Sequence, residues 1–238
     1  MSDVISTIIA QGAKELNIEL PPEAGAAFRA YYDFLEERGQ NVNLTSISGA
    51  EEVARLHFLD SIALLNAVSF KDSRVIDVGS GAGFPGVPLK IAEPSINLTL
   101  LEATSKRVAF LTELCIMLGT DIACTNARAE EASNSMEKRE QFDIAVARAV
   151  ARLNSLCELC LPFVRVGGFF IAMKSIDSDE EISEAENAIN LLGGKLKEYY
   201  DYIIPGSEIV HRAVVIRKII TTPDQFPRRF AQIQKKPL

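Results

Sequence analysis

The segment that most constrains the fold of this chain is Val75–Gly83, which reads VIDVGSGAG. A short apolar run ends here in three closely spaced glycines, Gly79, Gly81 and Gly83. Glycine allows the backbone to turn tightly and to approach a ligand closely. In open α/β folds such a loop leaves the carboxyl end of a strand, where ligands bind. The segment therefore predicts a strand, a binding loop and a helix, in that order.

Short β-branched runs alternate with helical stretches from this segment onward. Alternation of this kind predicts a parallel sheet with helices on both faces. The last two strand-like runs have no crossover helix between them, so they should pair antiparallel. The expected fold class is a doubly wound, Rossmann-like α/β sheet, mostly parallel with an antiparallel C-terminal hairpin, as is typical of methyltransferases that use S-adenosylmethionine (SAM). The expected strands are 74–78, 97–101, 121–126, 142–147, 165–173, 195–204 and 212–220, and the expected helices are 85–92, 105–118, 152–161 and 179–191.

The first part of the chain has a helical pattern of apolar residues instead of alternating strands and helices. Aromatic residues at helical spacing from Phe28 to Leu35, and apolar periodicity over 50–68, predict helices there. The length of 238 residues and the apolar share of 47% suit one large domain with an extension. We therefore expect an N-terminal helical extension over 1–70 and a SAM-binding domain over 71–238 that forms a single compact unit.

Composition excludes several classes of protein. No uninterrupted apolar run approaches the roughly 18 residues of a membrane span. No basic segment followed by an apolar one opens the chain, so we expect no signal peptide and a cytoplasmic location. Cys157 and Cys160 form one C-x-x-C pair in an apolar helix without a second pair, which favours buried thiols over metal or redox chemistry. We expect no metal and a monomeric protein.

The charge is distributed unevenly along the chain. The formal net charge is −7, yet residues 212–238 carry seven basic side chains and one acid, so that tail is +6 and the rest is −13. A basic tail on an acidic body can bind a polyanion such as RNA. It can equally be a solvated end, and composition leaves both interpretations open.

The glycine loop by itself fits two cofactors. Residues 81–86, GAGFPG, match the G-x-G-x-x-G fingerprint of dinucleotide folds, so a NAD-dependent oxidoreductase is the alternative. Asp77 favours SAM, because a carboxylate suits the ammonium group of a methionine moiety better than it suits a pyrophosphate. Pro85 also favours SAM, because proline lacks an amide that a pyrophosphate would bind. Proline is common at the first position of a helix.

Acidic residues follow the next two strands. Glu102 ends the second strand, where a carboxylate accepts both ribose hydroxyls of a nucleoside. Ala129 and Glu130 follow the third strand, the edge of the cleft at which an adenine would lie. The acid at 130 also suits the first turn of a helix, so this assignment stays open.

Basic residues follow the fourth and fifth strands. Arg148 and Arg152 flank the end of the fourth strand, and arginine there suits an anionic or carbonyl-rich substrate such as RNA. An ion pair of Arg148 with Asp143 or a nearby acid is the structural alternative. Lys174 ends the fifth strand and is expected to face the same cleft. His57 lies on an apolar helix, where a core or interface role is favoured over catalysis.

Five short motifs occur together in this chain: Asn43-Leu44-Thr45, His57-Phe58-Leu59-Asp60-Ser61, residues 77–86 (DVGSGAGFPG), Lys106-Arg107-x-x-Phe110-Leu111 and Ala147-Arg148-Ala149. The combination resembles the bacterial RsmG (GidB) family of small-subunit rRNA methyltransferases. The resemblance runs from about Tyr31 to Leu238. The glycines alone would be unspecific, but the loop with Phe-Pro-Gly attached and the His-x-Leu-Asp-Ser helix together are specific.

The resemblance implies a function and a set of site residues. That family methylates N7 of a guanine in the 530 loop of 16S rRNA, at position 527 in standard rRNA numbering, within the small ribosomal subunit. With Gly81 added from the loop itself, the implied SAM contacts are Gly79, Phe84, Glu102, Ala103, Thr104, Ala129, Glu130 and Arg148. The implied basic positions are Lys106, Arg107, Arg128 and Arg148, to which the residues themselves add Arg152, Lys174 and Arg212 as candidate RNA contacts. The chain departs from the family at Arg38-Gly39, where Trp-Asn is common, and at Ser175, where glycine is common.

The implied reaction needs no general base. Guanine N7 has a free lone pair at neutral pH, so catalysis would consist of aligning N7 with the sulfonium methyl in a desolvated site. This agrees with the lack of a catalytic His or Cys beside the glycine loop. We therefore predict no catalytic residue in the strict sense. A non-enzymatic RNA-binding module would fit the basic tail, but it has little use for Asp77, Glu102 and the loop glycines together.

Overall fold

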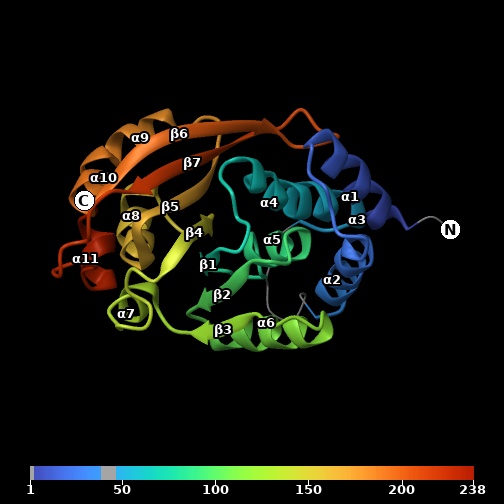
Figure 1. The fold of residues 1–238 in the computed structure, drawn as a ribbon, viewed down its shortest axis with the longest axis horizontal. Coiled ribbons are helices and arrows are strands. Elements are labelled where there is room, and N and C mark those ends of the chain that lie inside the picture. Colours follow the sequence, from blue (N-terminus) through green and yellow to red (C-terminus); the bar gives the residue numbers. More distant parts are fainter. Residues whose placement is uncertain (1–2, 39–46) are drawn as a thin grey trace.

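A single mixed sheet organises the structure, a computed structural model that describes residues 3–38 and 47–238 (Figure 1). Within these residues the sheet has seven strands in the order β3-β2-β1-β4-β5-β7-β6. The strands are β1 Arg74–Val78, β2 Asn97–Glu102, β3 Ala123–Asn126, β4 Phe142–Arg148, β5 Val164–Ser175, β6 Gly194–Ile203 and β7 Val210–Lys218.

The strand pairing confirms the expected fold class. Strands β1 to β5 are parallel, whereas β7 pairs antiparallel with both β5 and β6. β5 ends at Ser175 and β7 begins at Val210, so both extend beyond the ranges expected from the sequence. Ser175 consequently lies opposite His211. The antiparallel course of β7 thus brings its first residues to the edge where the parallel strands end.

Helices of very different length surround the sheet. The longer ones are α1 Val4–Glu15, α2 Ala24–Arg38 and α6 Ser105–Met117. The shorter ones are α3 Ala50–Val53, α4 Asp60–Ile62, α5 Gly86–Ala92, α7 Ala129–Ala132, α8 Leu153–Cys160, α9 Asp179–Glu184, α10 Glu186–Leu191 and α11 Phe230–Lys235. A π-helical segment covers Ala54–Leu59, and 3-10 turns cover Ala63–Asn66 and Leu161–Phe163.

Two expected helices are interrupted. The stretch expected at 50–68 winds as α, π, α and then 3-10 helix, and its carbonyl at Leu56 accepts a hydrogen bond from Arg148 of β4. Wide π turns often occur at functional sites, where they redirect backbone groups. The helix expected at 179–191 is two short helices that meet at Ala185. Tertiary contacts therefore determine the type of helix in each turn, and the apolar periodicity of the sequence does not predict it.

Each face of the sheet buries its own apolar core. On β4, Ile144 and Val146 point to one core while Ala145 and Ala147 point to the other, which is the alternation of a strand buried on both sides. The N-terminal helices pack with α5 and α6 over the first face, and α8 to α11 lie over the second (Figure 1). The N-terminal residues thus share one continuous core with the sheet.

Some expectations concern the chain as a whole. Among the described residues no helix is long and apolar enough to cross a membrane. In the same residues no cluster of three or more His, Cys, Asp or Glu side chains has the arrangement of a metal site. Cys157 and Cys160 are both fully buried, as expected of structural thiols.

Candidate active site

Two adjoining pockets lie at the carboxyl edge of the sheet. The large pocket, of about 820 Å³, extends from the glycine loop to the end of β5 and the start of β7. The small pocket, of about 290 Å³, lies over the ends of β1, β2 and β3. Gly79, Arg107 and Arg148 line both, so the two pockets meet beside the glycine loop. This is the edge at which open α/β folds bind ligands.

The glycine loop is clamped on two sides. Gly79 and Gly83 have φ angles of 77° and 107°, in the region that favours glycine. A Cβ on Gly79 would lie 2.7 Å from Val150 Cγ2, and one on Gly83 would lie 2.6 Å from Tyr31 Oη. The Tyr31 hydroxyl also donates a 2.6 Å hydrogen bond to the carbonyl of Ala82. Helix α2 and the segment after β4 therefore both determine the path of the loop.

Asp77 organises the loop from behind. Its side chain is fully buried, Oδ2 accepts a 2.9 Å hydrogen bond from the amide of Gly86, and Oδ1 has no partner among the described residues. Burial raises the pKa of this carboxyl to about 7. Asp77 lines neither pocket. In this structure the carboxyl group holds the start of α5 from behind the loop, and a contact between Asp77 and the ammonium group of SAM stays a prediction.

Glu102 lies between the loop and the small pocket. Oε2 accepts the amide of Gly81 at 3.1 Å and Oε1 accepts the amide of Thr104 at 2.8 Å. A carboxylate has about four acceptor sites, so Glu102 retains capacity for the two hydroxyls of a ribose. A Cβ on Gly81 would meet nothing closer than 3.9 Å, so the loop backbone borders open space there.

The small pocket has the chemistry of a nucleoside site. Ala129 and Glu130 line it at the start of α7, together with the apolar side chains of Leu101, Leu159 and Phe230. An apolar slot next to a ribose-binding carboxylate suits a planar base, as in other cofactor sites. The predicted contacts Glu102, Ala103, Ala129 and Glu130 are therefore brought together, whereas Thr104 contributes its amide to Glu102 and lines neither pocket.

Phe84 connects the glycine loop to the N-terminal helices. Its ring stacks on Tyr31 at 5.4 Å and on His57 at 4.5 Å between centroids. The guanidinium carbon of Arg148 lies 4.8 Å from the centre of the same ring, within cation–π range. Phe84 and Arg148, two of the predicted cofactor contacts, thus form one wall of the large pocket.

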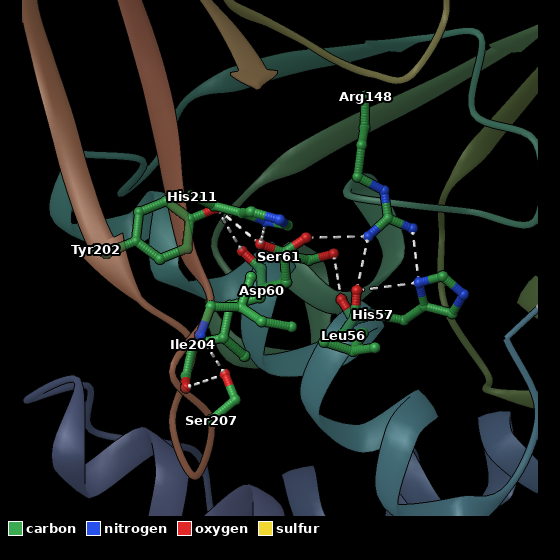
Figure 2. Close-up of polar contacts among 10 residues, drawn as sticks. Leu56, His57, Asp60, Ser61, Arg148, Tyr202, Ile204, Ser207 and His211 are labelled. Carbon is green, nitrogen blue, oxygen red and sulfur yellow. Dashed lines mark hydrogen bonds and ion pairs between the residues drawn. The ribbon is translucent and has the colours of Figure 1, made fainter. Parts of the chain in front are cut away.

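Arg148 is held by residues far from it in sequence (Figure 2). Nη1 donates to the carbonyl of Leu56 at 3.2 Å and to Asp60 Oδ2 at 3.3 Å, and Nη2 contacts His57 Nδ1 at 3.1 Å. The structural alternative, an ion pair with Asp143 or a nearby acid, is confirmed for a nearby acid: the partner is Asp60, whereas Asp143 binds Arg165. The guanidinium is thereby oriented by the helical extension rather than by its own strand.

His57 is a buried, neutral histidine. Its Nδ1 lies 3.1 Å from Arg148 Nη2 and 3.1 Å from the carbonyl oxygen of Leu56. Burial and the nearby charge of Arg148 lower the pKa of His57 to about 4. The expected interface role fits these contacts, although His57 also lines the large pocket.

Sequence reasoning missed a second cluster on the far side of this pocket. Asp60 is 1% exposed, and its Oδ1 accepts hydrogen bonds from Tyr202 Oη and His211 Nδ1, both at 2.8 Å (Figure 2). The sequence signal was weak: an acid inside an apolar helix, and one of only two histidines at a strand start. The partners come from the extension and the C-terminal hairpin, which no local pattern connects.

Apart from Arg148, the six candidate RNA contacts separate into two groups. Arg107, Arg128 and Lys174 line the pockets, although Lys174 Nζ already pairs with Glu181 at 2.6 Å. The remaining three lie outside the pockets. Lys106 is exposed on α6, Arg152 pairs with Glu184, and Arg212 is buried between Asp179 and Asp201.

Comparison with known proteins now identifies the family. A family model described as rRNA small subunit methyltransferase G (GidB) matches residues 25–206. This chain belongs to the rRNA small subunit methyltransferase G family. Two curated members carry that name. The one from Alkaliphilus oremlandii is 44% identical over 98% of this chain and 99% of its own length. The one from Alkaliphilus metalliredigens is 45% identical over 97% of this chain and 98% of its own length. The motif Asn43-Leu44-Thr45 that contributed to the resemblance lies outside the described residues.

Solved structures agree at the level of fold. An O-methyltransferase from Klebsiella pneumoniae, named as putative, has a TM-score of 0.56 at 14% identity over 90% of this chain and 97% of that chain. An M. jannaschii protein in complex with AdoMet has a TM-score of 0.54 at 16% identity over 75% of this chain and 80% of its own. As a member of the methyltransferase G family, the chain is a SAM-dependent methyltransferase. The oxidoreductase and the non-enzymatic RNA-binding module are therefore set aside.

Proposed function

We propose that this protein transfers a methyl group from SAM to N7 of a guanine in the 530 loop of 16S rRNA, at position 527. The observation that supports this best is a large pocket that opens beside the glycine loop in a chain of the methyltransferase G family. At about 820 Å³ the pocket falls in the usual range for small-molecule sites, so it has room for a nucleotide.

We assign the cofactor to the glycine loop and the small pocket. Glu102 would accept the ribose hydroxyls, while Ala129 and Glu130 would border the adenine. Gly79 and Gly81 would let the rest of the cofactor pass close to the backbone. SAM supplies an electrophilic methyl group on a positively charged sulfur. The chain has to hold the nucleoside while leaving the large pocket open to the acceptor.

The polar groups of the large pocket suit positioning rather than proton transfer. Guanine N7 attacks with a free lone pair, so no proton has to leave first. His57 is a poor base, because burial and the charge of Arg148 lower its pKa to about 4. Arg148 is itself held by Asp60 and Leu56. Rigid side chains of this kind orient a bound base and exclude water.

We also propose the organisation and setting of the molecule. Residues 71–238 would form the compact methyltransferase domain. Residues 1–70 would be an extension that completes the acceptor side of the large pocket, meaning the part that would hold the guanine to be methylated. The contacts of Leu56, His57 and Asp60 with Arg148 support this division of roles. The protein would act as a monomer in the cytoplasm, where 16S rRNA is assembled into small subunits.

The decisive experiment is methyl transfer with mapping of the product. Small subunits and naked 16S rRNA from cells lacking the enzyme are incubated with the protein and tritiated SAM, and the labelled nucleotide is identified. The proposal predicts label on N7 of one guanine in the 530 loop. Label on another atom or another loop would contradict it, as would no label on either substrate.

A matched pair of variants tests the cofactor assignment in the same assay. Glu102→Gln removes the charge that would accept ribose hydroxyls, so SAM affinity should fall about tenfold, the usual range for a hydrogen bond to a charged group. Glu131→Gln removes an exposed acid from the first turn of α7 and should leave SAM affinity unchanged. Equal affinities for the two variants would remove Glu102 from the site.

A further inference from the structure

His211 lines the large pocket and not the small nucleoside pocket. It lies at the start of β7 opposite Ser175, whereas Glu102 and Ala129 follow β2 and β3 on the other side of the sheet. The His211 side chain is 31% exposed and lines the large pocket. Because the proposed function assigns the cofactor to the small pocket and the glycine loop, this end of the large pocket is left for the methyl acceptor.

Asp60 determines which nitrogen of His211 faces the pocket. The buried carboxylate binds Nδ1 at 2.8 Å through Oδ1, and the same oxygen accepts the hydroxyl of Tyr202 at 2.8 Å (Figure 2). A histidine whose Nδ1–H is held by a carboxylate has its ring orientation and tautomer specified. Because Nδ1 is occupied, Nε2 is the nitrogen left for a ligand in the pocket.

The charges around His211 favour its protonated form. The hydrogen bond to Asp60 raises the pKa of His211, against the opposing effects of burial and of Arg148. From the other packed elements, Tyr202 of β6 meets the ring edge-on and Lys174 of β5 lines the same pocket. The single negative charge of Asp60 is shared between Arg148 and His211. When His211 is protonated, the cluster presents a net positive charge to the pocket.

Among the described residues, the other cations that line the large pocket each have an acidic partner. Lys174 pairs with Glu181, Arg148 pairs with Asp60, and Arg107 lies 3.8 Å from Glu102. A polyanionic substrate bound by a protein of net charge −7 needs local positive groups. His211 has an available donor nitrogen on the acceptor side.

We propose that Asp60 and His211 form an anion subsite whose ligand is a backbone phosphate of the RNA beside the methylated guanine. His211 donates from Nε2 to a phosphate oxygen, and Asp60 acts as a positioning residue that orients the imidazolium. This inference rests on the proposed function. The other source of the same chemistry is the carboxylate of SAM, and the experiment is arranged to distinguish the two.

The first test compares His211→Gln with Arg217→Gln. Arg217 is an exposed cation near the far end of the same strand, so its removal controls for a lost charge on β7. His211→Gln should raise the KM for small subunits about tenfold, as expected for loss of a charge-assisted hydrogen bond. It should also reduce the salt dependence of RNA binding by about one unit of slope. The Kd for SAM should stay the same, and Arg217→Gln should match the wild type.

The second test uses the fact that the chain has only two histidines. Their NMR titrations in the full-length protein are assigned with His211→Gln, and Asp60→Asn should lower the His211 pKa. An RNA oligonucleotide with the 530-loop sequence should raise the His211 pKa, whereas SAM alone should not. In the wild type, the KM for RNA should rise as pH increases through that pKa, and in His211→Gln this rise should vanish.

Several results would overturn the subsite. An unchanged KM for RNA in His211→Gln would do so. If, in addition, this variant binds SAM more weakly, the ligand of His211 is the carboxylate of SAM and not an RNA phosphate. If Asp60→Asn does not fold, judged by its melting temperature, His211→Gln still decides the question. Failure of methyl transfer by the wild type would remove the proposed function, whereas an RNA-induced shift in the His211 titration would still report the subsite.

Discussion

Buried acids determine the positions of the groups around both pockets. Asp77 accepts a hydrogen bond from the amide of Gly86, and Glu102 accepts from the amides of Gly81 and Thr104. Asp60 contacts the side chains of Tyr202, His211 and Arg148. A buried carboxylate is costly unless it receives hydrogen bonds or a counter-charge. Glu102 and Asp60 meet that condition. Asp77 meets it only in part, because its Oδ1 has no partner among the described residues.

The raised pKa of Asp77 predicts a specific pH dependence of stability. The folded pKa is about 7 against 3.8 for the free side chain, so the folded state holds a proton that the unfolded state has released between about pH 4 and 7. Stability from this group therefore falls as pH rises through that window. In Asp77→Asn this loss is absent. Between pH 4 and pH 8 the free energy of unfolding of the cofactor-free wild type should therefore change unfavourably by roughly 2–4 kcal/mol relative to that of the variant.

Urea unfolding at the two pH values measures this difference. The control is Asp72→Asn, which changes an exposed acid in a turn. The free energy of unfolding of Asp77→Asn is compared with that of the wild type at each pH. If this difference is the same at pH 4 and pH 8, Asp77 does not titrate in that range.

At the level of elements, the glycine loop depends on helix α2. The Tyr31 hydroxyl donates to the carbonyl of Ala82 and occupies the space beside Gly83. A sequence pattern predicts the loop, because the glycines are contiguous with the strand. It does not predict the clamp, because Tyr31 and Ala82 are 51 positions apart. The helix of Tyr31 is evident from its periodicity, but its docking partner is not.

A pair of glycine substitutions separates backbone strain from crowding. Gly83 and Gly119 both have positive φ, but a Cβ at Gly119 would meet nothing within 4 Å, whereas one at Gly83 would meet Tyr31 Oη at 2.6 Å. Gly119→Ala should cost about 1 kcal/mol from the backbone alone. Gly83→Ala should cost about 3 kcal/mol, since strain and overpacking add.

Chemical denaturation gives both values, and SAM titration follows the functional effect. Gly83→Ala should also weaken SAM binding, whereas Gly119→Ala should not. Equal stabilities of the two variants would show that Tyr31 does not clamp the loop.

At the level of the whole molecule, the strand positions and the sheet class were predictable, but the part of the large pocket around Asp60 and His211 was not. Apolar runs and turn residues are local signals, and they indicated every strand of the sheet within a few residues. The contact of Arg148 with Asp60 spans 88 positions, and that of His211 with Asp60 spans 151. These long-range contacts join the N-terminal helices, the sheet and the C-terminal hairpin, and only the fold reveals them.

The central claim is that this assembly aligns a guanine N7 with the methyl group without removing a proton. The most direct test is the single-turnover rate of methyl transfer at saturating SAM and saturating small subunits, measured from pH 6 to pH 9. Saturation removes the effect of His211 on RNA binding, so the rate should stay level across this range. A rate that rises about tenfold per pH unit would report an essential general base and would contradict the account.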